Sequence, residues 1–148
     1  MKFQKLTYSG TKCNSYLYFA FDAEMFNTNQ ITTELNIEPT SVKIKKEPIP
    51  KSTSWKFQID VGEEIDLETP LEKLIDIFES KIIEINSLKE KYKLETRLQF
   101  VIDIDINPEM STPYFGLNKR AIKFLNQTET IVDFDLYKAD TIGVIKDK

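Results

Sequence analysis

The chain has 148 residues, of which 41% are hydrophobic, and its 24 acidic and 20 basic side chains leave a formal net charge of −4. This length suits one domain, 1-148, and the hydrophobic content excludes an intrinsically disordered chain. No apolar run is long enough to cross a bilayer, and the acidic balance disfavours binding to a nucleic acid backbone. We therefore expect one globular domain that binds neither membrane nor nucleic acid.

Cysteine and histidine usage restricts the chemistry that the chain can perform. Cys13 is the one cysteine, histidine is absent, and residues 1–10 carry no secretory signal pattern. An intrachain disulfide is thereby excluded, and we expect a cytoplasmic protein. The lack of histidine removes the commonest general base and metal ligand, so we expect no cofactor, no metal site and no cysteine nucleophile.

Four segments alternate apolar and polar residues with the period of a half-buried strand: 15–22, 54–61, 95–106 and 131–137. Their predicted inward residues are Leu17, Phe19, Phe21, Trp55, Phe57, Ile59, Val61, Leu98, Phe100, Ile102, Ile104, Ile106, Val132, Phe134 and Leu136. Weaker alternation predicts a strand at 40–46, an arm or edge strand within 1–14, and a short strand at 142–145 within a polar tail, 138–148.

Helix signals separate these strands. Asn27 and Asn118 each precede a helical pattern, and Asn36 is suited to the left-handed end of the first helix. Between them, Thr69 followed by a proline and a glutamate predicts a capped helix start. Apolar residues at spacings of three and four then continue toward Tyr92, with a break near Ser80.

The predicted order of elements is β-α-β-β-α-β-α-β. Its first six elements match the split βαβ pattern, so we predict an α+β fold with a ferredoxin-like core plus an extra αβ unit. Alternating strands indicate a mainly antiparallel sheet with helices on one face, because a sheet covered on both sides would have continuously apolar strands.

Three passages are similar to the bacterial domain of unknown function family 4279. Residues 31–40, ITTELNIEPT, resemble that family's short helix and its G-I-x-P-T turn, with Asn36 in place of the usual glycine. Trp55 follows a basic loop, and residues 133–137, DFDLY, resemble the closing strand. The resemblance extends from Tyr16 to Tyr137. It implies a fold type and a bacterial origin, and no activity.

The outward positions of the predicted strands form the candidate site. We expect a protein partner to bind Tyr16, Tyr18, Asp103, Asp105, Asp133, Asp135 and Tyr137. Exposed tyrosines are effective interface anchors, and carboxylates steer a basic partner. Lys56 and Arg97 are expected to offset these acids on the same face.

This pattern favours a non-catalytic binding module, of which an immunity-type protein that neutralises a toxin is one concrete form. The alternatives are a carboxylate or divalent-metal enzyme on the same face and a homodimer built on that face. A second, weaker hypothesis is an anion site at the lysine-rich loop, made by Lys43, Lys45, Lys46 and Lys51.

Overall fold

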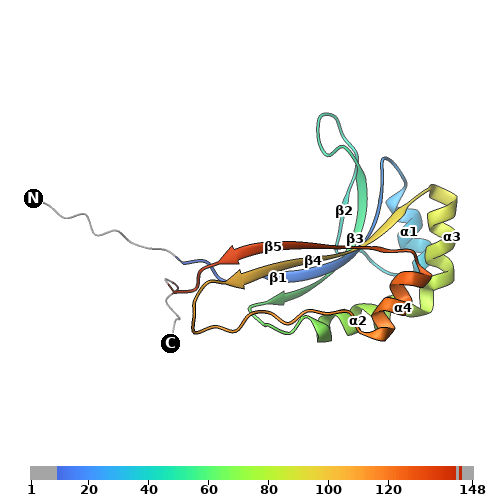
Figure 1. Ribbon diagram of the computed structural model, residues 1–148. Coiled ribbons are helices and arrows are strands. Elements are labelled where there is room, and N and C mark those ends of the chain that lie inside the picture. The colour runs from blue at the N-terminus through green and yellow to red at the C-terminus, as the bar shows by residue number, and fades with distance from the viewer. Residues whose placement is uncertain (1–9, 143, 145–148) are drawn as a thin grey trace, which may run out of the picture.

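The structure, a computed structural model, describes residues 10–142 and residue 144 (Figure 1). The strands are β1 (Ser15–Ala23), β2 (Ser41–Lys43), β3 (Thr53–Gly62), β4 (Glu95–Asp105) and β5 (Ile131–Ala139). The helices are α1 (Thr28–Leu35), α2 (Glu68–Phe78), the 3₁₀ turn η1 (Glu79–Lys81), α3 (Ile82–Tyr92) and α4 (Lys119–Gln127).

The strands form one five-stranded sheet in the order β2-β3-β1-β4-β5. Neighbouring strands are antiparallel except β4 and β5, which are parallel. The predicted α+β class and mainly antiparallel sheet are confirmed. The order β2-β3-β1-β4 is consistent with a split βαβ core, and α4 with β5 forms the extra αβ unit at the edge.

The described helices lie on one side of the sheet and cover its apolar face (Figure 1). The predicted inward residues of β1, together with Trp55 and most of those of β4, are buried in this core. Trp55 also donates a hydrogen bond from Nε1 to the hydroxyl of Thr32, 3.0 Å away, which ties α1 to β3. The alternation therefore identifies the covered face correctly for β1, β3 and β4, whereas the predicted inward residues Ile106, Phe134 and Leu136 are exposed.

Two of the three predicted helix caps are correct. Asn27 Oδ1 accepts from the amide of Asn29, and Asn118 Oδ1 accepts from the amide of Ala121. The predicted cap at Thr69 is wrong. Asp66 accepts instead from that threonine's hydroxyl at 2.6 Å and its amide at 3.3 Å, so its carboxylate takes the capping place at the start of α2.

The long helical pattern is interrupted where the sequence suggests, by η1 between α2 and α3. The predicted strand at 40–46 is shorter than expected, because only Ser41–Lys43 pair with β3. β5 extends through Lys138 and Ala139, so the predicted polar tail begins too early. Most of the predicted arm or edge strand within 1–14 lies outside the described residues, and residues 10–14 form no strand. Of the predicted short strand at 142–145, residues 143 and 145 lie outside the described residues, and 142 and 144 are not in a strand.

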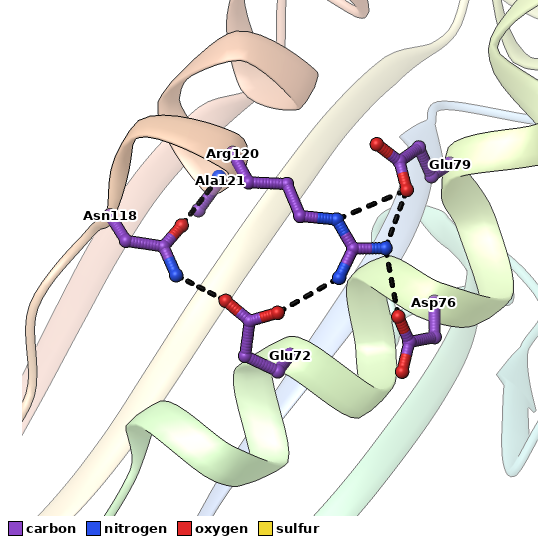
Figure 2. A network of polar contacts seen from close by, with 6 residues as sticks. All are labelled: Glu72, Asp76, Glu79, Asn118, Arg120 and Ala121. Atoms are coloured by element: carbon purple, nitrogen blue, oxygen red, sulfur yellow. Dashed lines mark hydrogen bonds and ion pairs between the residues drawn. The ribbon is translucent and has the colours of Figure 1, made fainter.

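Arg120 holds the start of α4 against α2 (Figure 2). Its guanidinium donates to Glu72 and to Asp76, each at 2.8 Å, and to Glu79 from Nε at 3.1 Å. Asn118 donates to the second oxygen of Glu72 from its side-chain amide. Because α4 leads directly into β5, this network helps to set where the last strand begins.

Two stacked phenylalanines on the helix-covered face differ in how far they are buried. Phe100 and Phe134 have ring centroids 5.0 Å apart, but Phe100 is 1% exposed and Phe134 is 41% exposed. We predict that Phe100→Ala lowers the free energy of unfolding by about 3–5 kcal/mol and that Phe134→Ala lowers it by about 1–2 kcal/mol. Urea titrations of both variants measure the difference, and equal losses would contradict the difference in burial between the two rings.

Candidate partner-binding face

The open face is the side of the sheet opposite the helices (Figure 1). Pairing aligns Tyr16 with Val101 and Tyr18 with Gln99 across the two antiparallel strands β1 and β4. Across the parallel pair, Asp103 aligns with Tyr137. By this register all seven predicted side chains belong to the open face: Tyr16, Tyr18, Asp103, Asp105, Asp133, Asp135 and Tyr137.

One end of the open face is organised by Arg97. Its guanidinium donates to Asp22 Oδ2 at 3.0 and 3.1 Å and to Gln99 Oε1 at 2.7 Å. Gln99 is only 1% exposed, so this bond satisfies a buried amide oxygen. Ser54 completes the network by donating to the other oxygen of Asp22 at 2.6 Å. No spacing in the sequence predicts this network, because its members come from β1, β3 and β4.

Tyr18 is not the exposed ring that we expected, because it is only 7% exposed. The Nζ of Lys56 lies 4.5 Å from its ring centroid, and Arg97 lies 5.6 Å from it. Cations stack favourably on aromatic faces, and their aliphatic stems shield the ring from water. Burial raises the pKa of Tyr18, while Arg97 opposes that rise.

These contacts also correct the expected role of the two cations. Arg97 forms its ion pair with Asp22, and Lys56 lies over Tyr18. Among the described residues, no ion pair joins a basic side chain to Asp133 or Asp135. The open face is therefore polarised: its cations lie at the Arg97 end, and acids without an ion pair follow β5 from Asp133, beside Gln99, to Asp135.

The second end, which we call the acidic end, comprises Tyr16, Asp103, Asp133, Asp135 and Tyr137. The Tyr137 side chain is 56% exposed, and Asp133 and Asp135 are exposed beside it. Tyr16 is half-buried and lies in one cross-strand row with Val101 and Asp135. Burial raises its pKa, and Tyr18, Tyr137, Asp135 and Asp103 add to the rise. Exposed aromatic and acidic groups thus lie together.

Asp103 and Asp105 accept hydrogen bonds from backbone amides. Asp103 Oδ2 accepts from the amide of Asn14 at 2.7 Å. Asp105 Oδ1 accepts from the amides of Asn107 and Thr141 at 3.0 and 3.2 Å, and its other oxygen accepts from the Thr141 hydroxyl. Asp105 therefore fastens two turns. Asp133 Oδ1 accepts from the amide of Phe134 at 3.0 Å, and Asp133 and Asp135 are the exposed acids that remain for a partner.

Cys13 borders a cavity of about 20 Å³, with Asp103, Asp105 and Glu63 among its lining residues. This is room for about one water molecule. Burial raises the pKa of the Cys13 thiol, and the three carboxylates raise it further. A protonated thiol is a poor nucleophile, so these surroundings do not favour covalent catalysis.

The lysine-rich loop connects β2 to β3. Lys45 forms an ion pair with Glu24, and its amide donates to the Thr53 hydroxyl at 3.0 Å. Lys43, Lys46 and Lys51 are exposed, and the anion site remains a prediction. Within the described part of the chain, no group of three or more cysteine, aspartate or glutamate side chains is arranged to hold a metal ion. The helices of that part are all too short or too polar to span a bilayer.

The Arg97 network generates a stability prediction. Arg97→Ala leaves the buried Gln99 oxygen and the Asp22 carboxylate without their donor, so we expect a loss of about 1–3 kcal/mol in the free energy of unfolding. Lys56→Ala is the matched control, because it removes a cation from the same tyrosine ring but no bond to Gln99, and should cost less than about 1 kcal/mol. Equal losses in denaturant titrations would show that stacking, not the hydrogen bonds, is what matters.

A second prediction concerns pH. The Thr141 hydroxyl, followed by the backbone amides, holds the pKa of Asp105 below its ordinary 3.8. The stabilisation from this carboxylate is therefore complete above that ordinary value and is lost as the pH falls through the lowered one. Thr141→Val should raise the pKa of Asp105, whereas Thr141→Ser should keep it low, as NMR titration of the carboxyl carbon can measure. An unchanged pKa in the valine variant would contradict this cause.

Comparison with known proteins places the chain in a family. No curated protein and no solved structure matches it significantly. One family model, described as a domain of unknown function, matches residues 11–139, which include every element of the sheet and the acidic end. Because this match covers most of its length, the chain belongs to the DUF4279 family.

Proposed function

We propose that this domain is a non-catalytic binding module that recognises a basic protein partner at the acidic end of its open face. The observation that carries the proposal is the polarisation of that face. Arg97 and Lys56 are engaged by Asp22 and Tyr18, and Asp133 and Asp135 remain exposed beside Tyr137.

The chemistry of the acidic end matches what a protein interface requires. Tyr137 offers an exposed ring with a polar tip, and Tyr16 stacks on Tyr18, with the centroids of these two rings 6.3 Å apart. Rings held in this way contribute contact area at little entropic cost. The unpaired carboxylates attract a basic partner over about a Debye length, so they act mainly on the association rate.

The acidic end lies on strands rather than in a cleft, and this supports binding over catalysis. A carboxylate that acts as a general acid needs an apolar pocket that raises its pKa, and Asp133 and Asp135 are exposed instead. An enzyme on this face is therefore the weaker hypothesis. A homodimer that paired two acidic ends would set like charges together, which also disfavours it. An immunity-type protein that neutralises a basic toxin is one form that the proposal takes.

The charge requirement can be tested by capture from a lysate of the native host. Asp133→Asn combined with Asp135→Asn should reduce capture of the partner roughly tenfold at low salt. The control combines Glu47→Gln with Glu90→Gln, which removes the same charge from exposed sites elsewhere and should leave capture unchanged. Equal capture by both double variants would contradict the proposal.

The anchoring role of tyrosine needs a separate comparison. Tyr137→Ala should accelerate dissociation of the captured partner, because buried aromatic anchors act mainly on the dissociation rate. Tyr114→Ala is the control, since Tyr114 is similarly exposed, at 61%, but lies in the loop before α4. If the two variants dissociated at the same rate, the acidic end would not be the contact surface.

A further inference from the structure

β5 forms one edge of the sheet, and its hydrogen-bonding pattern shows which backbone groups are free. Ile106 donates from its amide to the carbonyl of Ala139 at 2.9 Å, so the backbone carbonyl of Ala139 points toward β4. In a parallel ladder, successive residues direct their amide and carbonyl to opposite sides. The backbone groups of the odd-numbered residues of β5 therefore bond to β4. The backbone amides and carbonyls of the even-numbered residues point away from β4; these are Val132, Phe134, Leu136 and Lys138.

Two further contacts agree with this assignment. The Phe134 amide is bonded by the side chain of Asp133 at 3.0 Å, as expected for a group without a strand partner. Asp140 faces the same outer side, where its carbonyl accepts from the Thr11 amide at 2.7 Å and its amide donates to the Thr11 hydroxyl at 3.0 Å. In the described chain, the open stretch of this edge thus runs from Val132 to Lys138.

The side chains of this edge differ on its two faces. On the helix side, Phe134 and Leu136 are 41% and 55% exposed, although they point toward the core layer. Phe115 contacts the Phe134 ring at a centroid distance of 5.7 Å and does not cover it. On the open face, Asp133 and Asp135 stand exposed along the same strand. A strand added at this edge would therefore contact apolar side chains on the helix side and acidic side chains on the open face.

A second copy of this chain avoids opposed carboxylates only in registers shifted toward Leu136 or Tyr137, and in every register its β5 brings no basic side chain to the open face. Antiparallel pairing of two β5 strands centred on Phe134 would set Asp133 opposite Asp135 of the other copy, and centring it on Asp135 would oppose two identical carboxylates. Like charges directly opposite each other destabilise a sheet. A strand with basic residues on one face and apolar residues on the other has neither problem, because it neutralises the acids and covers Phe134 and Leu136.

We propose that β5 is a strand-addition site for an extended segment of a protein partner in which basic and apolar residues alternate. This inference rests on the proposed function and specifies how the partner is bound. Main-chain hydrogen bonds to the outward groups of Val132, Leu136 and Lys138 provide affinity, and the alternating side chains provide specificity.

The probe is a capped nine-residue peptide of alternating lysine and valine, the length of β5. It should bind the full chain and slow exchange of the Val132, Leu136 and Lys138 amides roughly tenfold or more, because these amides gain hydrogen bonds. A peptide of alternating glutamate and valine is the control and should not bind. Failure of the lysine peptide to bind, or binding without protection of these three amides, would overturn the proposal.

A pair of variants isolates the role of the backbone. Leu136→Pro removes an outward amide and places a ring on the open edge, where proline is tolerated in a strand. Leu136→Ala loses the same apolar side chain but keeps the amide. We expect the proline variant to bind the peptide at least about tenfold more weakly than the alanine variant, with both folded by circular dichroism. Equal affinities would overturn the proposal.

The two proposals fail differently. Equal peptide affinities of Leu136→Pro and Leu136→Ala would remove strand addition and leave recognition at the acidic end intact. Equal capture of the partner after Asp133→Asn with Asp135→Asn and after the matched glutamate substitutions would remove the proposed function itself.

Discussion

The pairing of β1 between β3 and β4 is the constraint on which the rest of the structure depends. Because side chains alternate across a strand, this register sends Leu17, Phe19 and Phe21 under the helices and Tyr16 and Tyr18 to the open face. A shift by one residue would exchange the two sets and bury polar groups in the core. Packing of the aromatic core thus fixes the strand register, and the register in turn determines which polar side chains lie on the open face.

The polarity of the open face follows from how its charges are satisfied. Arg97 donates to the buried amide oxygen of Gln99 and forms its ion pair with Asp22, so it forms no ion pair with the acids of β5. A guanidinium gains more from such directed bonds than from a diffuse field at the surface. The same face therefore has a hydrogen-bonded end, which stabilises the fold, and an acidic end, whose carboxylates are exposed.

Local rules predicted much of this from the sequence, and non-local contacts account for what they missed. The caps at Asn27 and Asn118 and the alternation of β4 depend on neighbours in the chain. Thr69 does not cap α2 because the helix already begins at Glu68, where the Asp66 carboxylate accepts from the amides of Glu68 and Thr69. The partner of Arg97 lies 75 residues away, so no spacing rule could identify it. Likewise, alternation places Phe134 and Leu136 on the inner face but cannot reveal that the helices leave this edge uncovered.

Residue-resolved amide hydrogen exchange in the free protein tests the arrangement of β5 most directly. If β5 is a parallel edge strand in this register, the amides of Asp133, Asp135 and Tyr137 should exchange far more slowly than those of Val132, Leu136 and Lys138. Uniform protection along the strand, or the opposite alternation, would contradict both the register and the open edge.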